Sequence, residues 1–246
     1  MSSFGNVIWG SEGDQFKATA TKTLPFGTQM KFLDGREFIY ARAGATDLTV
    51  GTLQQQAVAV TTDIKALAVP SAEIVGATSV GVTMQTVLTA NYYKEGFLFV
   101  STGTGLGYMY KIKSHAAEST GTGEATFLLE EGSALRVAWD TTTKVGLRKH
   151  PCDYTVIAPT TETGALVGVS TRAVTTLYYC WLQKKGPAIV LTNGTVVVGE
   201  GVTRGVTTAG SVDPYNEDGA ANILPLGDVM SVGGSTEYSL INLNIP

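Results

Sequence analysis

Short apolar runs separated by turn residues recur at regular spacing along the second half of the chain, beginning near Pro151. Such runs are strand candidates because β-branched and aromatic residues fit a pleated, half-buried surface. About eight residues separate one run from the next, a spacing typical of a small antiparallel β-barrel or β-sandwich. We therefore predict a compact domain over residues 151–246. Its expected strands are residues 155–158, 166–170, 177–183, 188–191, 196–198, 202–206, 229–232 and 238–243.

The run at residues 177–183 carries the largest side chains of this series. Successive residues of a strand point to opposite faces, so Tyr179, Trp181 and Gln183 share one face and the residues that precede each of them share the other. Both faces carry bulk, which predicts a central strand that is buried on both sides. Gly186 and Pro187 follow directly, and we expect them to end the strand.

Two glycine-containing turns predict β-hairpins. The turn at residues 103–107 separates an apolar run at 97–100 from the alternating segment 108–113. The pair Asn193-Gly194 lies between two valine-rich runs and is a strong signal for a type I′ turn. A further strand is expected at 36–42, and residues 36–150 are predicted to form a β-rich subdomain with hairpins.

The first 35 residues have no clean period of 2 or 3.6 in their apolar positions. We therefore predict an irregular N-terminal arm, lying either on its own domain or on a neighbouring subunit. Its aromatic side chains need a surface to bury them, so they are the candidate contacts with a partner. These candidates are Phe4, Trp9, Phe16 and Phe26. The whole pattern predicts a mainly β protein with a barrel or sandwich core, this arm and little helix.

The composition adds one observation to this pattern, which is an unusually low fraction of charged residues. Charged residues make up 15% of the 246 residues, and Thr, Ser, Gly and Ala take their place at polar positions. A free monomer usually relies on charge to stay soluble, so we expect partners to cover much of the surface. The net charge of −4 includes no basic block, which argues against a nucleic-acid partner. No apolar run is long enough to span a membrane, and the N-terminus does not resemble a signal peptide.

Candidate chemistry is sparse. The glycine-rich residues 103–107 resemble a phosphate-binding loop, but no helix is expected after them to bind the anion, so the hairpin interpretation is preferred. His115, His150, Cys152 and Cys180 could in principle bind zinc or form a nucleophile pair, but their spacing matches no standard site. We expect the two cysteines to be reduced, buried thiols.

Acidic residues are scattered, and solvated loop charge is their expected role. A glycosidase would need two carboxylates across a cleft, and nothing in the spacing favours such a pair. The acidic residues considered are Glu130, Glu131, Asp213, Glu217 and Asp218. We therefore predict no enzyme activity, no catalytic or metal-binding residues and no cofactor.

Several motifs of the chain resemble those of structural proteins of tailed bacteriophages. Residues 178–188 are similar to a Tyr-x-Trp-x-Gln-x-x-Gly-Pro-Ala block of those proteins, and residues 207–212 are similar to their Thr-x-Ala-Gly-x-Val turn. Residues 226–227 and 237–245 are similar to their closing strand, and residues 91–112 to an Asn/Tyr/Gly hairpin. The resemblance covers residues 90–245, and these motifs belong to the scaffold.

The resemblance implies a virion structural role, namely that of a capsid decoration or cement protein. Such a protein binds the major capsid protein and itself, as a homotrimer, on the capsid surface after synthesis in the host cytoplasm. The aromatic residues of the arm would then be subunit or capsid contacts. The alternative is a tail or fibre component that binds host-surface glycans, which would require an exposed aromatic patch with convergent polar groups. A virion-borne hydrolase is a third, weaker alternative.

Overall fold

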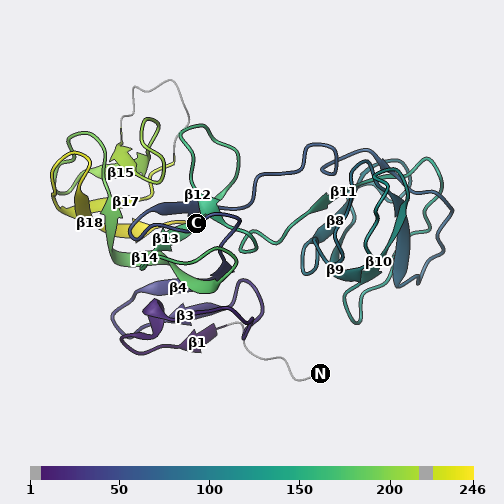
Figure 1. Ribbon diagram of the computed structural model, residues 1–246, viewed down its shortest axis with the longest axis horizontal. Helices are drawn as coiled ribbons and strands as arrows, with labels where there is room; N and C mark the ends of the chain where they lie inside the picture. Colours follow the sequence, from purple (N-terminus) through teal and green to yellow (C-terminus); the bar gives the residue numbers. More distant parts are fainter. Residues whose placement is uncertain (1–6, 216–223) are drawn as a thin grey trace. The chain divides into compact units, whose positions relative to one another are not determined.

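A computed structural model describes residues 7–215 and 224–246, and the chain divides into two compact units (Figure 1). Unit 1 is built from the chain up to Ala57 together with the chain from Pro151 onward, and unit 2 is Val58–His150. Residues 36–57, which the sequence pattern placed with the following hairpins, belong with the C-terminal part of the chain. The reason is that β4 (Glu37–Arg42) pairs with β14 (Tyr179–Leu191).

Unit 1 contains a mixed 12-stranded sheet. Its main path runs through β1 (Val7–Trp9), β3 (Gln29–Lys31), β4, β14, β18 (Tyr238–Asn244), β17 (Gly227–Ser231), β15 (Gly201–Arg204) and β16 (Val212–Pro214). β1 and β3 are parallel, and the other pairs on this path are antiparallel. Off the path lie β2 (Ala18–Thr19), β5 (Leu53–Gln55), β12 (Val156–Ile157) and β13 (Leu166–Ser170).

The long strand β14 contributes side chains to three separate apolar clusters of unit 1. Ala188 and Val190 belong to one apolar cluster, Leu182 belongs to a second with Cys180, and Trp181 packs in a third. The prediction that residues 177–183 form a central strand buried on both faces is confirmed from Tyr179 to Gln183, where only Tyr179 is partly exposed. Leu177 and Tyr178 precede the strand and are exposed.

The expectation that Gly186 and Pro187 end this strand is wrong. Gly186 has φ +82°, a left-handed conformation that glycine adopts without steric cost, and it bends the strand instead of stopping it. Pairing with β4 ends at Lys185, and from there β18 is the strand that pairs with β14 as far as Leu191. A proline is tolerated at this point because it lies beyond the paired edge on the β4 side.

The expected hairpin at Asn193-Gly194 is also not formed, since residues 196–198 are not a strand. Thr192 forms an isolated bridge with Val212 instead. The Asn193 side-chain amide donates hydrogen bonds to Thr207 Oγ1 at 2.6 Å and Asp213 Oδ1 at 3.2 Å. Side-chain bonding of this kind lets an Asn-Gly pair shape a loop without two flanking strands.

Unit 2 is a closed six-stranded barrel with the strand order β10-β7-β6-β11-β8-β9. The strands are β6 (Leu67–Ala68), β7 (Ser79–Thr83), β8 (Phe97–Thr102), β9 (Met109–His115), β10 (Glu124–Leu129) and β11 (Lys144–Arg148). Alternate side chains of β9 and β10 fill one apolar core, as the period of a strand requires. The turn at residues 103–107 joins β8 to β9, so the predicted hairpin is confirmed. The prediction of a mainly β fold with a barrel or sandwich core is confirmed as well.

The segment expected to be an irregular arm is mostly loop between short strands. Within its described residues, 7–35, it contributes β1, β2, β3 and one short 3-10 helix, η1 (Asp14–Phe16). Two hydrogen bonds join η1 to the C-terminal segment of unit 1: Thr171 Oγ1 donates to the Gln15 carbonyl and Arg172 Nη1 donates to the Phe16 carbonyl, both at 2.8 Å. Across residues 7–215 and 224–246, no helix has the length and apolar character needed to cross a bilayer.

Candidate functional site

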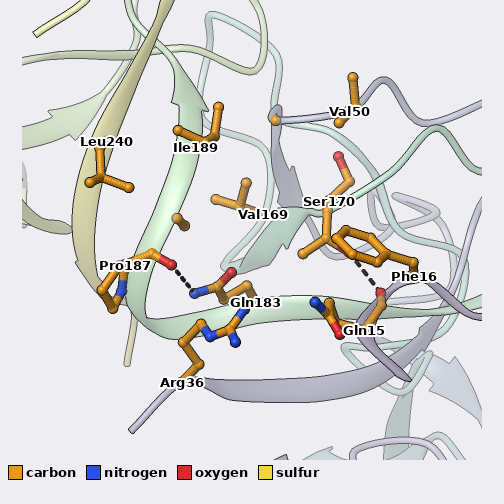
Figure 2. Close-up of a pocket in the computed structure, with 13 residues that line it drawn as sticks. Gln15, Phe16, Arg36, Val50, Val169, Ser170, Gln183, Pro187, Ile189 and Leu240 are labelled. Atoms are coloured by element: carbon orange, nitrogen blue, oxygen red, sulfur yellow. Dashed lines mark hydrogen bonds between the residues drawn. The ribbon is translucent and has the colours of Figure 1, made fainter. Parts of the chain in front are cut away.

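The bend of β14 is held by one buried amide. Gln183 Nε2 donates hydrogen bonds to the carbonyl oxygens of Lys185, Gly186 and Pro187, at 3.1, 3.4 and 2.8 Å. Figure 2 shows this side chain turned back along its own strand toward Pro187. The Gln of the block at residues 178–188 therefore has a structural role, which is to hold the backbone that the following Gly-Pro pair bends.

A hollow of about 200 Å³ lies beside this bend (Figure 2). Phe16 and Ser170 line it opposite Pro187, and Arg36 lies at its lower edge. Arg36 is engaged by carboxylates, because its Nε donates to Asp34 at 2.7 Å and its Nη2 donates to Glu12. These partners leave Arg36 little capacity to bind an anion in the hollow.

One hydroxyl group in the lining of this hollow is buried. Ser170 is its buried hydroxyl, and the Ser170 Oγ donates to the Thr49 carbonyl oxygen and receives a hydrogen bond of 3.3 Å from Gln54. A nucleophilic serine needs a general base within hydrogen-bond reach. The described residues that line the hollow include no histidine and no carboxylate, so Ser170 has no base there.

A second hollow, of about 320 Å³, has aromatic walls. We call it the aromatic hollow. Strand β14 supplies Tyr179 and Trp181, β4 supplies Tyr40, and β1 supplies Trp9. Tyr40 and Trp181 are register partners whose rings meet edge to face with centroids 5.2 Å apart. Tyr179 stacks beside Tyr40 at 5.9 Å, so the floor of the hollow is a row of packed rings.

Polar side chains surround the mouth of the aromatic hollow. Asp14 and Lys17 form an ion pair of 2.6 Å, and the Ser11 amide donates to the same carboxylate at 2.7 Å. The hydrogen bond from Lys17 and then that from Ser11 lower the pKa of Asp14, so the group is an anion at neutral pH. Thr19 and Thr23 complete the polar part of the lining. The aromatic hollow therefore combines an apolar floor with hydroxyl groups and one neutralised ion pair.

The structure separates the four aromatic residues that the sequence suggested as contacts. Phe4 lies outside the described residues. Trp9 is 72% exposed and lines the aromatic hollow, whereas Phe16 is 48% exposed and lines the hollow at the bend. Phe26 is half-buried and packs on Tyr179, with the Lys22 ammonium 3.8 Å from its ring centroid. Exposure thus leaves Trp9 and Phe16 available to a partner.

Sequence reasoning did not identify the aromatic hollow itself. Tyr40 is 139 or more residues away from Tyr179 and Trp181 along the chain, and only the β4–β14 pairing brings them together. The available signal was the presence of large aromatic residues at alternate positions of both segments. That signal identified two strands but not the fact that they are neighbours.

The histidines and cysteines considered as metal ligands or nucleophiles lie in different settings. His115 is in the barrel of unit 2, where its Nε2 accepts a 2.9 Å hydrogen bond from the Tyr93 amide. Cys152 and Cys180 are buried in one apolar cluster of unit 1, and burial raises the pKa of each thiol to about 12. Among the described residues, no three His, Cys, Asp or Glu side chains form a group that could hold a metal ion.

The acidic residues are similarly dispersed. Glu131 pairs with Lys113 at 2.7 Å, and Glu130 lies 4.0 Å from Lys111. Asp213 accepts a hydrogen bond from Asn193, while Glu217 and Asp218 lie outside the described residues. Glu130, Glu131 and Asp213, the three of these residues that the structure describes, are therefore engaged in local contacts.

Comparisons of this chain with protein-family models, with curated proteins and with solved structures find no match.

Proposed function

We propose that this chain is a structural component of a tailed-phage virion, acting as a capsid decoration protein that binds the major capsid lattice and stabilises the head. The proposal starts from the resemblance of residues 178–188 and 237–245 to blocks of such proteins. In the fold these two blocks lie on β14 and β18, which pair over the seven residues from Lys185 to Leu191. Their motif residues shape and pair the sheet, as scaffold motifs of a structural protein would.

The observation that carries the proposal is the amount of apolar side chain left in solvent. In unit 1, Leu33 is 95% exposed, and in unit 2 Ile74 is 75% exposed. Further exposed apolar residues of unit 2 are Val75, Val87, Leu106 and Met109. Each such side chain gains about 1.5–3 kcal/mol when a partner buries it fully. A chain with 15% charged residues and this surface is suited to permanent contact with a partner.

The mechanism is physical. A protein that binds the assembled capsid lattice and not its dissociated subunits stabilises the lattice by mass action. Association into a homotrimer places three copies of each weak contact on one particle, so that avidity exceeds the strength of a single contact. Phe16 and Leu33 of unit 1 are the contacts we assign to this interface, together with the exposed apolar residues of unit 2. No catalytic step enters this role.

Co-sedimentation with expanded capsids of its own phage tests the proposal. We expect the purified protein to be a trimer by light scattering and to pellet with the capsids at saturating stoichiometry. The double variant Leu33→Ser, Ile74→Ser should pellet much less, whereas the control Thr160→Ala, Ser119→Ala, which changes one exposed polar position in each unit, should pellet as the parent does. A monomeric protein that stays in the supernatant would exclude the decoration role.

A further inference from the structure

The aromatic hollow is open to solvent on one side and closed by packed rings on the other. Trp9 lies at the open side with 72% of its surface exposed, whereas Tyr40 and Trp181 are buried at 3% and 6% exposure. The hollow of about 320 Å³ is at the lower limit of ligand sites, which span roughly 300–1,000 Å³. This size suits one or two small rings and not an extended cofactor.

Two hydrogen-bond donors in the walls have no acceptor among the residues that the structure describes. No described residue accepts a hydrogen bond from the indole N–H of Trp9 or of Trp181, although both side chains line the hollow. A hydrocarbon occupant that covered either N–H would leave it unpaired, which is unfavourable. The hollow therefore favours an occupant that carries oxygen acceptors.

The charges at the mouth indicate the charge of that occupant. Asp14 and Lys17 neutralise each other at 2.6 Å, so the lining presents no unpaired cation to attract an anionic ligand. The Asp14 carboxylate and the Thr19 and Thr23 hydroxyls can accept hydrogen bonds from hydroxyl groups. Thr19 Oγ1 uses its hydrogen to donate to the Thr21 carbonyl at 2.8 Å, so the same oxygen can still accept a hydrogen bond from a ligand.

We propose that the aromatic hollow is a carbohydrate-binding site that takes a neutral mono- or disaccharide unit of a glycan. A pyranose ring has an apolar C–H face and a rim of hydroxyls that both donate and accept, so it matches a ring floor with a polar mouth. Its C–H face stacks on the exposed Trp9 indole. Its oxygens accept from the indole N–H groups, and its hydroxyls donate to Asp14 and the threonines.

Titration with neutral disaccharides tests this assignment on the full-length protein. The probes are maltose, lactose and N,N′-diacetylchitobiose, and the signals are tryptophan fluorescence and amide chemical shifts. We expect at least one probe to bind and to shift resonances of Trp9, Tyr40 and Trp181, while those of Trp139, in the core of unit 2, stay unchanged. Trp9→Ala should weaken binding at least about tenfold, and Asp14→Asn should weaken it by a smaller factor.

Phe16→Ala is the matched control, because it removes an exposed aromatic ring from the neighbouring hollow. It should bind the same sugar with parental affinity, and all variants should keep the parental unfolding temperature. Failure of all three sugars to bind, or equal affinity of the Trp9→Ala protein, overturns the assignment. It is also overturned if a proline-rich peptide binds at the hollow and displaces the sugar, since that result makes the hollow a peptide groove.

The carbohydrate-site proposal does not depend on the decoration role, and different experimental results would contradict each of them. A capsid contact at Trp9 would make Trp9→Ala lose capsid binding in the co-sedimentation assay with no sugar response in the parent protein. A carbohydrate site gives the reverse result, with sugar binding lost and co-sedimentation retained.

Discussion

The side-chain amide of Gln183 donates a 2.8 Å hydrogen bond to the carbonyl oxygen of Pro187, four residues further along the same strand. The same nitrogen is within hydrogen-bond distance of the Lys185 and Gly186 carbonyls, so three consecutive backbone acceptors converge on one buried group. β14 leaves β4 and joins β18 at this point. One side chain therefore holds three consecutive backbone carbonyls at the point where the strand changes its partner.

Gln183→Ala should lower the free energy of unfolding of unit 1 by about 0.5–1.5 kcal/mol, because the backbone carbonyls at the bend lose their hydrogen bonds to this buried side chain. Urea unfolding followed by circular dichroism measures the change. Gln29→Ala is the matched control, since Gln29 is an exposed glutamine in β3, and it should have an effect within about 0.5 kcal/mol. Equal stabilities of the two variants would show that Gln183 does not hold the bend.

Gly146→Ala should destabilise unit 2 by about 1–3 kcal/mol through overpacking. A Cβ at this position of β11 would lie 2.2 Å from the Ile64 carbonyl oxygen and 2.5 Å from Phe99 Cζ. Gly201→Ala in β15 is the control, because its Cβ would meet Tyr215 Cβ at an ordinary 3.4 Å. Thermal unfolding of both variants checks this, and a parental melting temperature for Gly146→Ala would contradict the geometry.

The two thiols should be unreactive in the folded protein at pH 8. Burial raises the pKa of Cys152 and of Cys180 to about 12, so the nucleophilic thiolate is scarce. Ellman's reagent should modify both only after unfolding. Unfolded thiols ionise near pH 9 and folded thiols near pH 12, so between these values the unfolded state loses protons first. Stability should therefore fall as pH rises through this window, by at most about 1.4 kcal/mol per pH unit for each thiol.

Cys152→Ala isolates this contribution from that of other alkaline groups. It should show a shallower loss of stability than the parent above pH 9. Rapid modification of the folded parent protein at pH 8 would contradict the burial of the thiols.

Unit 2 should be acid-sensitive through His115. Burial is the main cause that lowers the pKa of this histidine below its ordinary 6.5, and its Nε2 must stay unprotonated to accept the Tyr93 amide. The stability it contributes is present above pH 6.5 and is lost as pH falls toward the lowered pKa, because only the unfolded state binds the proton. Urea unfolding at pH 7.5 and at lower pH measures this loss.

His115→Gln should remove most of the pH dependence between those conditions, because glutamine can accept the Tyr93 amide without titrating. Parental acid sensitivity in the His115→Gln variant would assign the effect to other titrating groups.

Local pattern was enough to predict the strands whose pairing is also local. The alternation of residues 108–113 and the glycine turn before it predicted β9 and its hairpin with β8, because both strands and their turn lie within one short stretch. The Gly186-Pro187 bend was not predictable in this way. It depends on Gln183 and on the end of the β4 pairing, and neither can be recognised without the tertiary structure.

The candidate sites show the same limit. Exposed aromatic residues of the N-terminal segment were identifiable from their aperiodic setting, and the structure does place Trp9 and Phe16 at the surface. Tyr40 and Trp181, which line the aromatic hollow with Trp9, have the pattern of ordinary core residues, and each packs in a core cluster. The hollow between them arises from strand order, which a single sequence does not encode in its periodicity.

The division of unit 1 into two chain segments has a consequence for synthesis on the ribosome. β4 emerges early, but its partner β14 emerges only after all of Val58–His150, which is a continuous segment able to close its own barrel. Domains fold as units while the chain is being made. The barrel of unit 2 can therefore be complete while one edge of β4 still lacks its partner strand. The strands that are translated first are thus among the last to complete their pairing in the sheet.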